Sequence, residues 1–503
     1  MKFQLFVPPQ GYMAQRWADG ESLPLMGVVY LGTVLRDAGH QVDLVPADVL
    51  QYRKSDIFQR IRSFQPRVLG VTTCTENRFD SFEVARIAKQ VDPGIVTVLG
   101  GPHVSLSDTD TLEHIPEVDI LVFGEGEVTI RELLTAINSG SGLGKVRGIA
   151  FRDPLDPGNI RITPPRPPIP DLDVLPIPDR SLLPLDRYRF SIRTRDGQNR
   201  KVANMITSRG CPFNCYFCST PRNWGRKTRG HSPRRVADEI EDAIVNYNAR
   251  YIWFFDDTFN YSKKRVHAIM DHIIERKFDI KFTCEFRIDL VDEPLLEKMR
   301  KAGLELGSFG VEAGNARIRR EVVGKDFDIE LVYRFIRWSR KFDFIPGAFM
   351  IFSNYQETWT HSRETLQVIR KMKDLNPLVD ISTAILHVYP GTPLEQIAKD
   401  IGVIPQGFSW ARRSDMKKTY QLPAAQGHVP LFKDRLSWFN IAELVMEWSE
   451  TSGKKTLTLS KLWQTIRSTN SLRSLHLNLI FFLAMIKSRV SALFRGRKQG
   501  SHD

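Results

Sequence analysis

Short apolar runs alternate with longer amphipathic stretches over the first 145 residues. The runs of strand length are Phe3–Val7, Gln41–Val45, Val68–Thr72, Ile95–Leu99 and Asp119–Phe123. Between them, apolar residues recur at helical spacing over residues 25–38, 57–64, 81–91 and 128–137. This alternation predicts an α/β domain over residues 1–145, with a doubly wound, Rossmann-like parallel sheet. Ligands of such sheets bind beyond the carboxyl ends of the strands.

A second alternation of strands and helices starts near Val202. Its strand candidates are Val202–Thr207, Tyr251–Phe255, Lys281–Glu285, Leu304–Val311, Gly347–Ile351 and Ile381–His387. Residues that favour helix starts lie between them, at Ser232-Pro233, Ser262 and Asp292. Six strand–helix units are fewer than the eight of a closed barrel, so residues 196–400 are expected to form a partial (β/α)6 barrel.

Residues 146–195 separate the two alternating regions and are expected to act as a linker. Their middle part, residues 152–185, is rich in proline, and a proline-rich segment is typically an extended, semi-rigid connector. The last region, residues 401–503, carries no chemical motif and is expected to be mainly helical. Within it, Leu436–Trp448 has the pattern of an amphipathic helix.

An apolar run at Leu475–Ile486 ends in a basic segment. Arg473 precedes the run, and the basic residues that follow it are Lys487, Arg489, Arg495, Arg497 and Lys498. The run is too short to span a bilayer. Two alternatives remain for residues 473–498: a helix that lies on an anionic membrane surface, or a helix that packs against the open side of the barrel.

Composition narrows the class of protein without identifying it. A chain of 503 residues with 42% hydrophobic residues has the size of two or three domains and an ordinary soluble composition. The net charge of +13 is spread along the chain, which favours a solvated surface over a nucleic-acid site. The apolar start ends at Pro8-Pro9 and is too short for a signal peptide. A cytoplasmic protein is therefore expected.

Three of the five cysteines, Cys211, Cys215 and Cys218, fall within eight residues with the spacing C-x3-C-x2-C. Thiolates are the usual ligands of iron–sulfur clusters, and one loop with this spacing can wrap a single cluster. A four-iron cluster would then keep one iron open to a small molecule. Structural zinc is the alternative, but it usually takes a second pair of ligands, and no such pair follows here.

The cysteine segment resembles the cluster loop of the radical S-adenosylmethionine (SAM) enzymes, C-x3-C-x-Φ-C, with Phe217 at the aromatic position. The resemblance implies a [4Fe–4S] cluster on the three cysteines. It also implies that the open iron binds SAM and that an electron from the cluster cleaves SAM to a 5′-deoxyadenosyl radical. Later segments extend the resemblance: Asp256-Asp257, Gly310–Gly314 with its G-x-E-x-G pattern, and Pro390-Gly391-Thr392. The SAM-binding residues that it implies are Phe217, Asp257, Arg287, Glu312 and Gly391.

One segment departs from this family. Relatives often carry G-x-P-x-E-T after the fifth strand, whereas this chain has Ser353-Asn354-Tyr355-Gln356-Glu357-Thr358. The Glu-Thr pair is retained, and the glycine and proline are lost.

Glycine pairs follow two strands of the first domain. With the segments around them, they resemble the cobalamin-binding domain that precedes the barrel in many radical SAM enzymes. The cobalamin-binding residues that the resemblance implies are Thr75, Gly100, Gly101, His103, Gly124 and Gly126. The D-x-H-x-x-G motif, which supplies a histidine to cobalt elsewhere, is absent. Cobalamin is therefore expected to bind without a histidine on cobalt, with His103 in a loop near the corrin or its tail.

The resemblance implies a cobalamin-dependent radical SAM enzyme. The favoured reaction is methyl transfer to an unactivated carbon through the 5′-deoxyadenosyl radical and methylcobalamin. The alternative is the same architecture without methyl transfer, as an anaerobic tetrapyrrole cyclase or a radical ring rearrangement. A corrinoid carrier or sensor would not need the cluster loop. The residues identify no catalytic acid or base.

The expected partners are a small-molecule substrate and an external one-electron donor such as flavodoxin or ferredoxin. The apolar tail favours an apolar substrate, such as a lipid, a polyprenoid or a tetrapyrrole. No nucleic-acid partner is expected. The membrane alternative for the tail would place the protein peripherally at the inner membrane face.

Overall fold

The computed structural model describes residues 1–9, 22–153, 156–421, 428–452 and 472–499. Contacts divide the chain into two compact units. The first unit comprises Met1–Phe213, Cys218–Leu306 and Ser409–Arg413. The second comprises Asn214–Phe217, Gly307–Phe408 and Ser414–Asp503.

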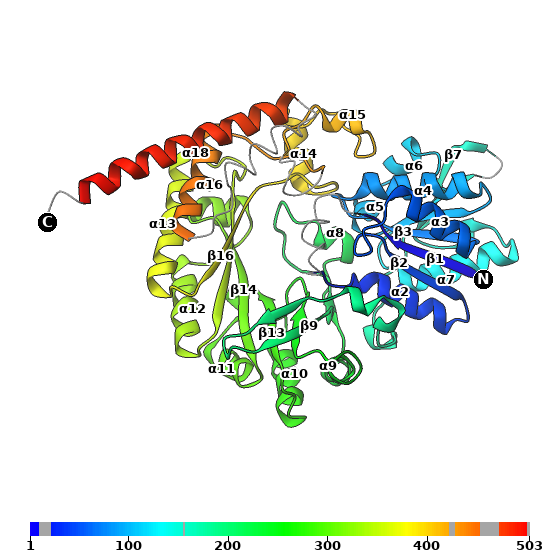
Figure 1. The fold of residues 1–503 in the computed structure, drawn as a ribbon, viewed down its shortest axis with the longest axis horizontal. Helices are drawn as coiled ribbons and strands as arrows, with labels where there is room; N and C mark the ends of the chain where they lie inside the picture. Colours follow the sequence, from blue (N-terminus) through cyan, green and yellow to red (C-terminus); the bar gives the residue numbers. More distant parts are fainter. Residues whose placement is uncertain (10–21, 154–155, 422–427, 453–471, 500–503) are drawn as a thin grey trace. The chain divides into compact units, whose positions relative to one another are not determined.

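The first unit begins with the expected doubly wound sheet, and its strand order is β2-β1-β3-β4-β5-β6-β7. The five predicted strands are present as β1 (Lys2–Val7), β2 (Gln41–Pro46), β3 (Val68–Thr72), β4 (Val96–Gly100) and β5 (Ile120–Val122). All of the pairs among them are parallel. Helices α2 (Met26–Asp37) and α7 (Gly126–Ser139) lie on one face, and α3 (Lys54–Phe64) and α4 (Arg78–Val91) lie on the other (Figure 1). The fold class predicted for this region is confirmed.

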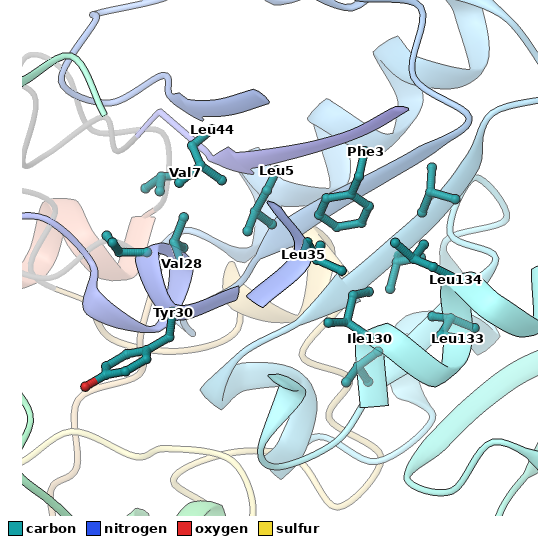
Figure 2. Close-up of a cluster of buried hydrophobic side chains, with 14 of the residues drawn as sticks. Phe3, Leu5, Val7, Val28, Tyr30, Leu35, Leu44, Ile130, Leu133 and Leu134 are labelled. Carbon is teal, nitrogen blue, oxygen red and sulfur yellow. The ribbon is translucent and has the colours of Figure 1, made fainter. Parts of the chain in front are cut away.

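Alternation along β1 builds the core on the α2 and α7 face. Phe3 and Leu5 point to this face, because side chains of a strand alternate between its two sides. They pack against Leu35 of α2 and Leu133 of α7, and all four side chains are buried (Figure 2). Burial of such apolar surface is the main force that holds helices on the sheet.

Two further strands extend this sheet beyond the predicted five. Strands β6 (Ile149–Asp153) and β7 (Asp156–Ile162) form an antiparallel hairpin, and β6 also pairs antiparallel with β5. Part of the segment expected to act as a linker therefore belongs to a sheet. The pattern was hard to recognise because β7 contains Pro157 and Gly158, which weaken a strand signal.

The strands of the second alternation form another sheet. In the first unit its order is β14-β13-β12-β9-β8, and in the second unit it is β16-β15-β14. The bounds of these strands are β8 (Ser191–Arg193), β9 (Asn199–Met205), β12 (Tyr251–Phe254), β13 (Lys281–Phe286), β14 (Leu304–Glu312), β15 (Ile345–Phe352) and β16 (Asp380–Ile385). The unit boundary falls inside β14, after Leu306.

A helix follows each of the six predicted strands. These helices are α9 (Pro233–Tyr247), α10 (Lys263–Glu275), α11 (Glu293–Lys301), α12 (Ile329–Lys341), α13 (Trp359–Leu375) and α14 (Pro393–Asp400). The predicted caps are confirmed: the side chains of Ser232, Ser262 and Asp292 each accept a hydrogen bond from a backbone N–H in the first helical turn. The six strand–helix units of the predicted partial barrel are present.

The C-terminal region is mainly helical, as expected. Its helices are α15 (Arg413–Met416), α16 (Trp438–Ser452) and α18 (Leu472–Gln499), and α18 packs on α16. Figure 1 shows the C-terminal end of α18 projecting past α16. Among the described residues, no helix combines the length and the apolar character needed to cross a membrane. The basic side chains at 489, 495, 497 and 498 lie outside the described side chains.

Candidate functional site

The three clustered cysteines lie between β10 (Ser208–Arg209) and α8 (Thr220–Trp224). All three thiols are half-buried, and Cys211 Sγ is 3.6 Å from the hydroxyl oxygen of Thr258. The division into units assigns Cys211 and Cys218 to the first unit and Cys215 to the second. Three accessible thiols on one loop are a donor set that fits a cluster.

The other two cysteines are poor candidates for ligands. Cys284 on β13 is fully buried, and burial raises the pKa of its thiol well above the usual value. Burial also raises the pKa of Cys74 to about 12. Within the described residues, no three His, Cys, Asp or Glu side chains converge on a single metal ion. A cluster does not require such convergence, because each of its ligands binds a different iron.

The chain can enter the cluster loop only through a glycine. Gly210 has φ +93°, in the left-handed region that side chains disfavour. A Cβ at this position would lie 2.6 Å from the carbonyl oxygen of Lys227. The backbone of Cys211 is held in turn, because its N–H donates to Gly225 O at 3.3 Å.

The acidic pair after β12 supports the start of this loop. Asp256 is 1% exposed and accepts hydrogen bonds from the backbone N–H and hydroxyl of both Thr207 and Ser208, at 2.5–3.2 Å. Asp256 therefore ties β12 to the strand that precedes the cysteines. The strand-end motif pointed to Asp257 and not to Asp256, because the motif alone does not reveal which of the two carboxylates points inward.

Asp257 is the more accessible carboxylate of the pair. It accepts a hydrogen bond from the Thr220 hydroxyl at 2.9 Å, two residues after Cys218. Desolvation by the surrounding protein raises the pKa of Asp257 to about 6, and repulsion by Asp256 adds to this effect. Its position beside the cluster loop is compatible with the SAM contact that the family implies.

Arg287, directly after β13, combines several features of a carboxylate-binding residue. Its guanidinium lies 3.7 Å above the Phe213 ring and binds both carboxylate oxygens of Asp289, at 2.8 and 2.9 Å. One further nitrogen, Nη1, is buried and has no hydrogen-bond partner among the residues that the structure describes. A buried N–H donor without a partner is costly, and a ligand carboxylate would satisfy it. The site thus fits the carboxylate of SAM.

In the second unit, the G-x-E-x-G segment ends β14 in an unusual conformation. Glu312 is 6% exposed and has φ +66°, which is uncommon for a residue other than glycine. Its Oε1 accepts a hydrogen bond from Lys325 Nζ at 2.6 Å, and Lys325 also donates to Gly310 O at 2.9 Å. A Cβ on Gly310 would clash with the Glu312 carboxylate and the Lys325 ammonium, so a larger residue there would displace this ion pair. Lys325 could not be identified from the sequence, because it lies outside any motif.

Two aromatic residues of the cluster loop, Tyr216 and Phe217, also belong to the second unit. The Phe217 ring meets the Tyr216 ring edge to face, with centroids 5.7 Å apart. Tyr216 OH donates to Asn354 Oδ1 at 3.3 Å and accepts from Tyr355 N–H at 3.1 Å. The S-N-Y-Q-E-T segment, which departs from the family pattern, thus supports the residue next to Phe217.

Ser353 has a left-handed conformation, with φ +70°, which suits the glycine that the family pattern has at this position. The Ser353 hydroxyl donates to Phe432 O at 3.0 Å and so compensates part of the strain. Gly391, at φ +68°, forms the turn before α14, and its N–H donates to Glu395 Oε2 at 2.7 Å. For Gly391 the structure shows a turn role.

The residues expected at the cobalamin site lie beyond the strand ends of the first sheet. Gly101 has φ +100°, and a Cβ there would lie 2.9 Å from backbone atoms of Thr73. Gly124 has φ +67° and faces open space, while a Cβ on Gly126 would meet Leu31 at 3.1 Å. Packing against Thr73 and Leu31 accounts for the glycines at 101 and 126, whereas Gly124 presents open backbone at a strand end, which a large, flat ligand can approach. The second glycine loop therefore fits cobalamin at Gly124.

His103 is buried inside the first sheet's own packing. Its side chain is 0% exposed, and Nδ1 is 3.2 Å from the Thr75 hydroxyl. The rings of Phe82 and Trp410 are each centred 6.5 Å from the imidazole. Burial lowers the pKa of His103 well below its usual value. The expectation of a loop position near the corrin is wrong, because His103 lies in the helix α5 (Pro102–Leu106) and its side chain is fully buried.

The implied site residues are divided between the two units. The first unit holds Thr75, Gly100, Gly101, His103, Gly124, Gly126, Cys211, Cys218, Asp257 and Arg287. The second holds Cys215, Phe217, Glu312 and Gly391. Each group is held by its own network of hydrogen bonds, and the cluster loop is the segment of chain that contributes to both.

Comparisons with known proteins identify both regions. Residues 20–134 match the B12 binding domain, and residues 205–369 match the radical SAM superfamily. An uncharacterized methyltransferase of Pyrococcus horikoshii is 33% identical over 401 residues, 79% of this chain and 83% of that protein. An anaerobic magnesium-protoporphyrin IX monomethyl ester cyclase of Rubrivivax gelatinosus is 31% identical over 406 residues, 79% of this chain and 70% of that protein.

A solved structure has the same fold over nearly the whole chain. The radical SAM methyltransferase TsrM of Kitasatospora setae, solved with cobalamin and a [4Fe–4S] cluster bound, superimposes with a TM-score of 0.72. The match covers 97% of this chain and 99% of that one at 17% sequence identity. At this identity the likeness concerns the fold.

Proposed function

Because this chain belongs to the radical SAM enzymes that carry an N-terminal B12-binding domain, we propose that it transfers a methyl group from SAM to an unactivated carbon of a small molecule. The cofactors of the family are a [4Fe–4S] cluster, SAM and cobalamin. The observation that supports this proposal most is the combination, in one chain, of the three-cysteine loop with a strand-end glycine loop whose backbone is open at Gly124.

The cofactors supply the chemistry, and the residues of the chain hold them. When bound, the cluster provides the electron that cleaves SAM, and cobalamin carries the methyl group. Cys211, Cys215 and Cys218 would hold the cluster. Arg287 has a free donor for the SAM carboxylate, and Glu312 can accept from the amine or a ribose hydroxyl of SAM.

The remaining contacts to SAM and cobalamin are also proposed from the chemistry of the groups that the chain presents. Phe217 presents a flat apolar ring that suits the adenine. Asp257, directly after β12, can accept a hydrogen bond from SAM or from a substrate hydroxyl. The cobalamin contacts that we propose are the backbone of the two glycine loops, at 100–101 and 124–126, together with Thr75. The domain boundaries at residues 195 and 400 belong to the same proposal, whereas the first sheet extends past residue 145 to the end of β7.

The experiment is an anaerobic incubation of the reconstituted enzyme with SAM that carries a labelled methyl group, and cell extract as the source of substrate. The proposal expects a labelled small molecule that forms only with cobalamin, cluster and reductant present. Omission of cobalamin should abolish the label. A product that is altered but carries no label would instead support the cyclase or rearrangement chemistry of the second relative.

The enzyme needs an electron from outside the chain for each SAM that is cleaved reductively. We propose a cytoplasmic one-electron donor, flavodoxin or ferredoxin, because thiolate ligands persist where thiols stay reduced. Turnover with purified flavodoxin and its reductase should match turnover with a chemical reductant. Turnover with the chemical reductant but with none of the flavodoxins and ferredoxins supplied would contradict the proposed electron donor.

Helix α18 has one buried apolar face and one exposed apolar face, and the exposed face favours an apolar surface as a further partner. Leu477, Phe481 and Ala484 are buried, whereas Leu479 and Leu483 are 44% and 57% exposed. Ile486, which continues the exposed stripe at helical spacing, is 41% exposed. Residues 472–499 contain no acidic residue and six Lys or Arg. We propose that this stripe lies on an anionic bilayer, which would bring an apolar substrate such as a lipid, polyprenoid or tetrapyrrole to the enzyme.

Liposome flotation tests this membrane contact with a closely matched pair of variants. Ile486 on α18 and Ile274 on α10 are both 41% exposed. Ile486→Glu should lower flotation with vesicles of anionic lipid several-fold, and Ile274→Glu should not. Binding that is equal for neutral and anionic vesicles, or an equal effect of the two variants, would contradict the proposal.

A further inference from the structure

Two carboxylates at the start of α7 reach from the second glycine loop to the strands that frame the cluster loop. Glu127 Oε1 lies 2.6 Å from Arg209 Nη2, and Glu125 Oε1 lies 2.7 Å from Arg229 Nη2. Arg209 belongs to β10 and Arg229 to β11 (Arg229–Gly230), which pair as an antiparallel hairpin around the cysteines. All four residues belong to the first unit.

This group is buried and electrically balanced. The exposed fractions are 8% for Glu125, 4% for Glu127, 3% for Arg209 and 8% for Arg229. Two carboxylates face two guanidinium groups, so each charge has an opposite charge in place of water. A buried charge without its partner is strongly unfavourable. Each side of this contact therefore holds the other in position.

The linker is held at the same point. The backbone N–H of Ile169 donates to Glu125 Oε2 at 2.7 Å, and Arg229 Nη1 donates to Ile169 O at 2.6 Å. One carboxylate and one guanidinium thus clamp the peptide groups of Ile169 from both sides. Three segments that are distant in sequence meet here: the second glycine loop, the linker and the hairpin.

Aromatic contacts reinforce this junction. The guanidinium of Arg209 lies 5.6 Å from the centroid of Tyr30 and 5.1 Å from that of Trp224 in α8. Figure 2 shows the Tyr30 hydroxyl pointing away from the aliphatic core. The Tyr30 hydroxyl donates to Glu239 Oε2 on α9 at 3.4 Å. The helix of the first glycine loop, α5 (Pro102–Leu106), contacts α8.

The ion pairs Glu127–Arg209 and Glu125–Arg229 lie next to the loops that are proposed to hold the cofactors, so they bear on the reaction. Glu127 is bonded to Gly126 of the cobalamin loop, and Arg209 is separated from Cys211 only by Gly210. The ion pair is therefore a short, stiff connection between the two cofactor loops. We propose that Glu125, Glu127, Arg209 and Arg229 are positioning residues that set the distance between cobalamin and the cluster. This inference rests on the proposed function.

Dipolar electron paramagnetic resonance on the holoenzyme tests the proposal directly. Cobalamin in its cobalt(II) state and the one-electron-reduced cluster each carry an unpaired spin, so their separation is measurable without a substrate. The wild type should give one narrow distance distribution. Glu127→Gln removes the nearer of the two carboxylates at Arg209 and leaves only Glu125, at 3.7 Å. It should widen the distribution at least twofold while iron and cobalamin contents stay at wild-type levels.

The control is Arg200→Lys. Arg200 lies on β9, the strand before β10, is 5% exposed and pairs with Asp196 and Asp279, each at 3.1 Å, neither of which belongs to a glycine loop. It should leave the distribution unchanged. Arg209→Lys keeps the charge but loses the forked geometry, and it should give an intermediate width. It provides the test if Glu127→Gln fails to fold.

The outcomes separate this inference from the proposed function. A wild-type protein that binds no cobalamin or no cluster would reject the proposed function. Both cofactors bound, with the same narrow distribution in Glu127→Gln and wild type, would overturn the positioning role alone. Loss of both cofactors in Arg209→Lys as well as in Glu127→Gln would also overturn it, because the four residues would then serve stability only.

Discussion

Glu312 and Lys325 form a buried ion pair in the second unit, with 2.6 Å between carboxylate and ammonium, on a backbone with φ +66° at Glu312. Strain of this kind persists only where the surroundings enforce it, and it is frequent at ligand sites. The pair can therefore serve either stability alone or the binding of SAM. The two roles give different results in a double-mutant cycle.

Glu312→Gln should destabilise the fold by about 3 kcal/mol, because Lys325 keeps a buried charge without a partner. Addition of Lys325→Met should recover most of this loss, since both charges are then removed. Binding of SAM, measured by equilibrium dialysis on the reconstituted protein, should stay at least tenfold weakened in the double variant. Recovery of SAM binding together with stability would show that Glu312 has a structural role only.

Ser353 provides a second test of strain, at the position where relatives have glycine. Ser353→Gly relieves about 1 kcal/mol of left-handed strain and loses a hydrogen bond to Phe432 O worth about 1 kcal/mol, so stability should hardly change. Ser353→Ala loses the bond and keeps the strain, and urea unfolding should show a loss of about 1 kcal/mol. An alanine variant as stable as the glycine variant would contradict this reading of the loop.

His387 should make the protein less stable in mild acid. Burial lowers the pKa of His387 to about 4 from 6.5. Between these values the unfolded chain binds the proton and the folded chain does not, so stability falls as pH falls from about 6.5 towards 4. From pH 7.5 to 5.5 this group should contribute a loss of about 1 kcal/mol.

The measurement is unfolding of the wild type and of His387→Gln at both pH values. The variant should lose about 1 kcal/mol less than the wild type on acidification, whatever its absolute stability. An equal loss in both proteins would mean that His387 is protonated in the folded state and would contradict the assigned pKa.

The cluster assignment predicts different effects for the two groups of cysteines. Replacement of Cys211, Cys215 or Cys218 with Ala should remove the iron–sulfur absorbance and reduce iron from about four per chain to near zero. Cys74→Ala and Cys284→Ala are the controls, because burial raises the pKa of both thiols. They should retain iron. Loss of iron in Cys284→Ala, without loss of folding, would contradict the three-cysteine assignment.

The strands and the cluster loop could be predicted because each is encoded by a short local pattern. The apolar run of β1 lies within six residues, and the three cysteines of the cluster loop lie within eight. The N-terminal turn of α3 was missed, because Lys54, Ser55 and Asp56 are polar and add nothing to an apolar period. The β6–β7 hairpin was missed for a similar reason, since proline and glycine interrupt its pattern.

Contacts between distant segments were not predictable from one sequence. Glu127 and Arg209 are 82 residues apart, and nothing local in either segment indicates the other. Nothing local around Lys325 indicates its partner either: Glu312 lies thirteen residues earlier, at the end of β14. The glycine at 310 was visible in the sequence, but its effect on the Glu312–Lys325 ion pair follows only from where the Glu312 carboxylate points.

The most direct test of the account is a count of the two products that SAM leaves during turnover with the true substrate. Methyl transfer to an unactivated carbon consumes two SAM molecules. One is converted to 5′-deoxyadenosine and the other to S-adenosylhomocysteine. Mass spectrometry should therefore find the two in near-equal amounts, with a product heavier by one methylene group. Deoxyadenosine without matching S-adenosylhomocysteine, while cobalamin is still required, would contradict methyl transfer and favour cyclisation or rearrangement.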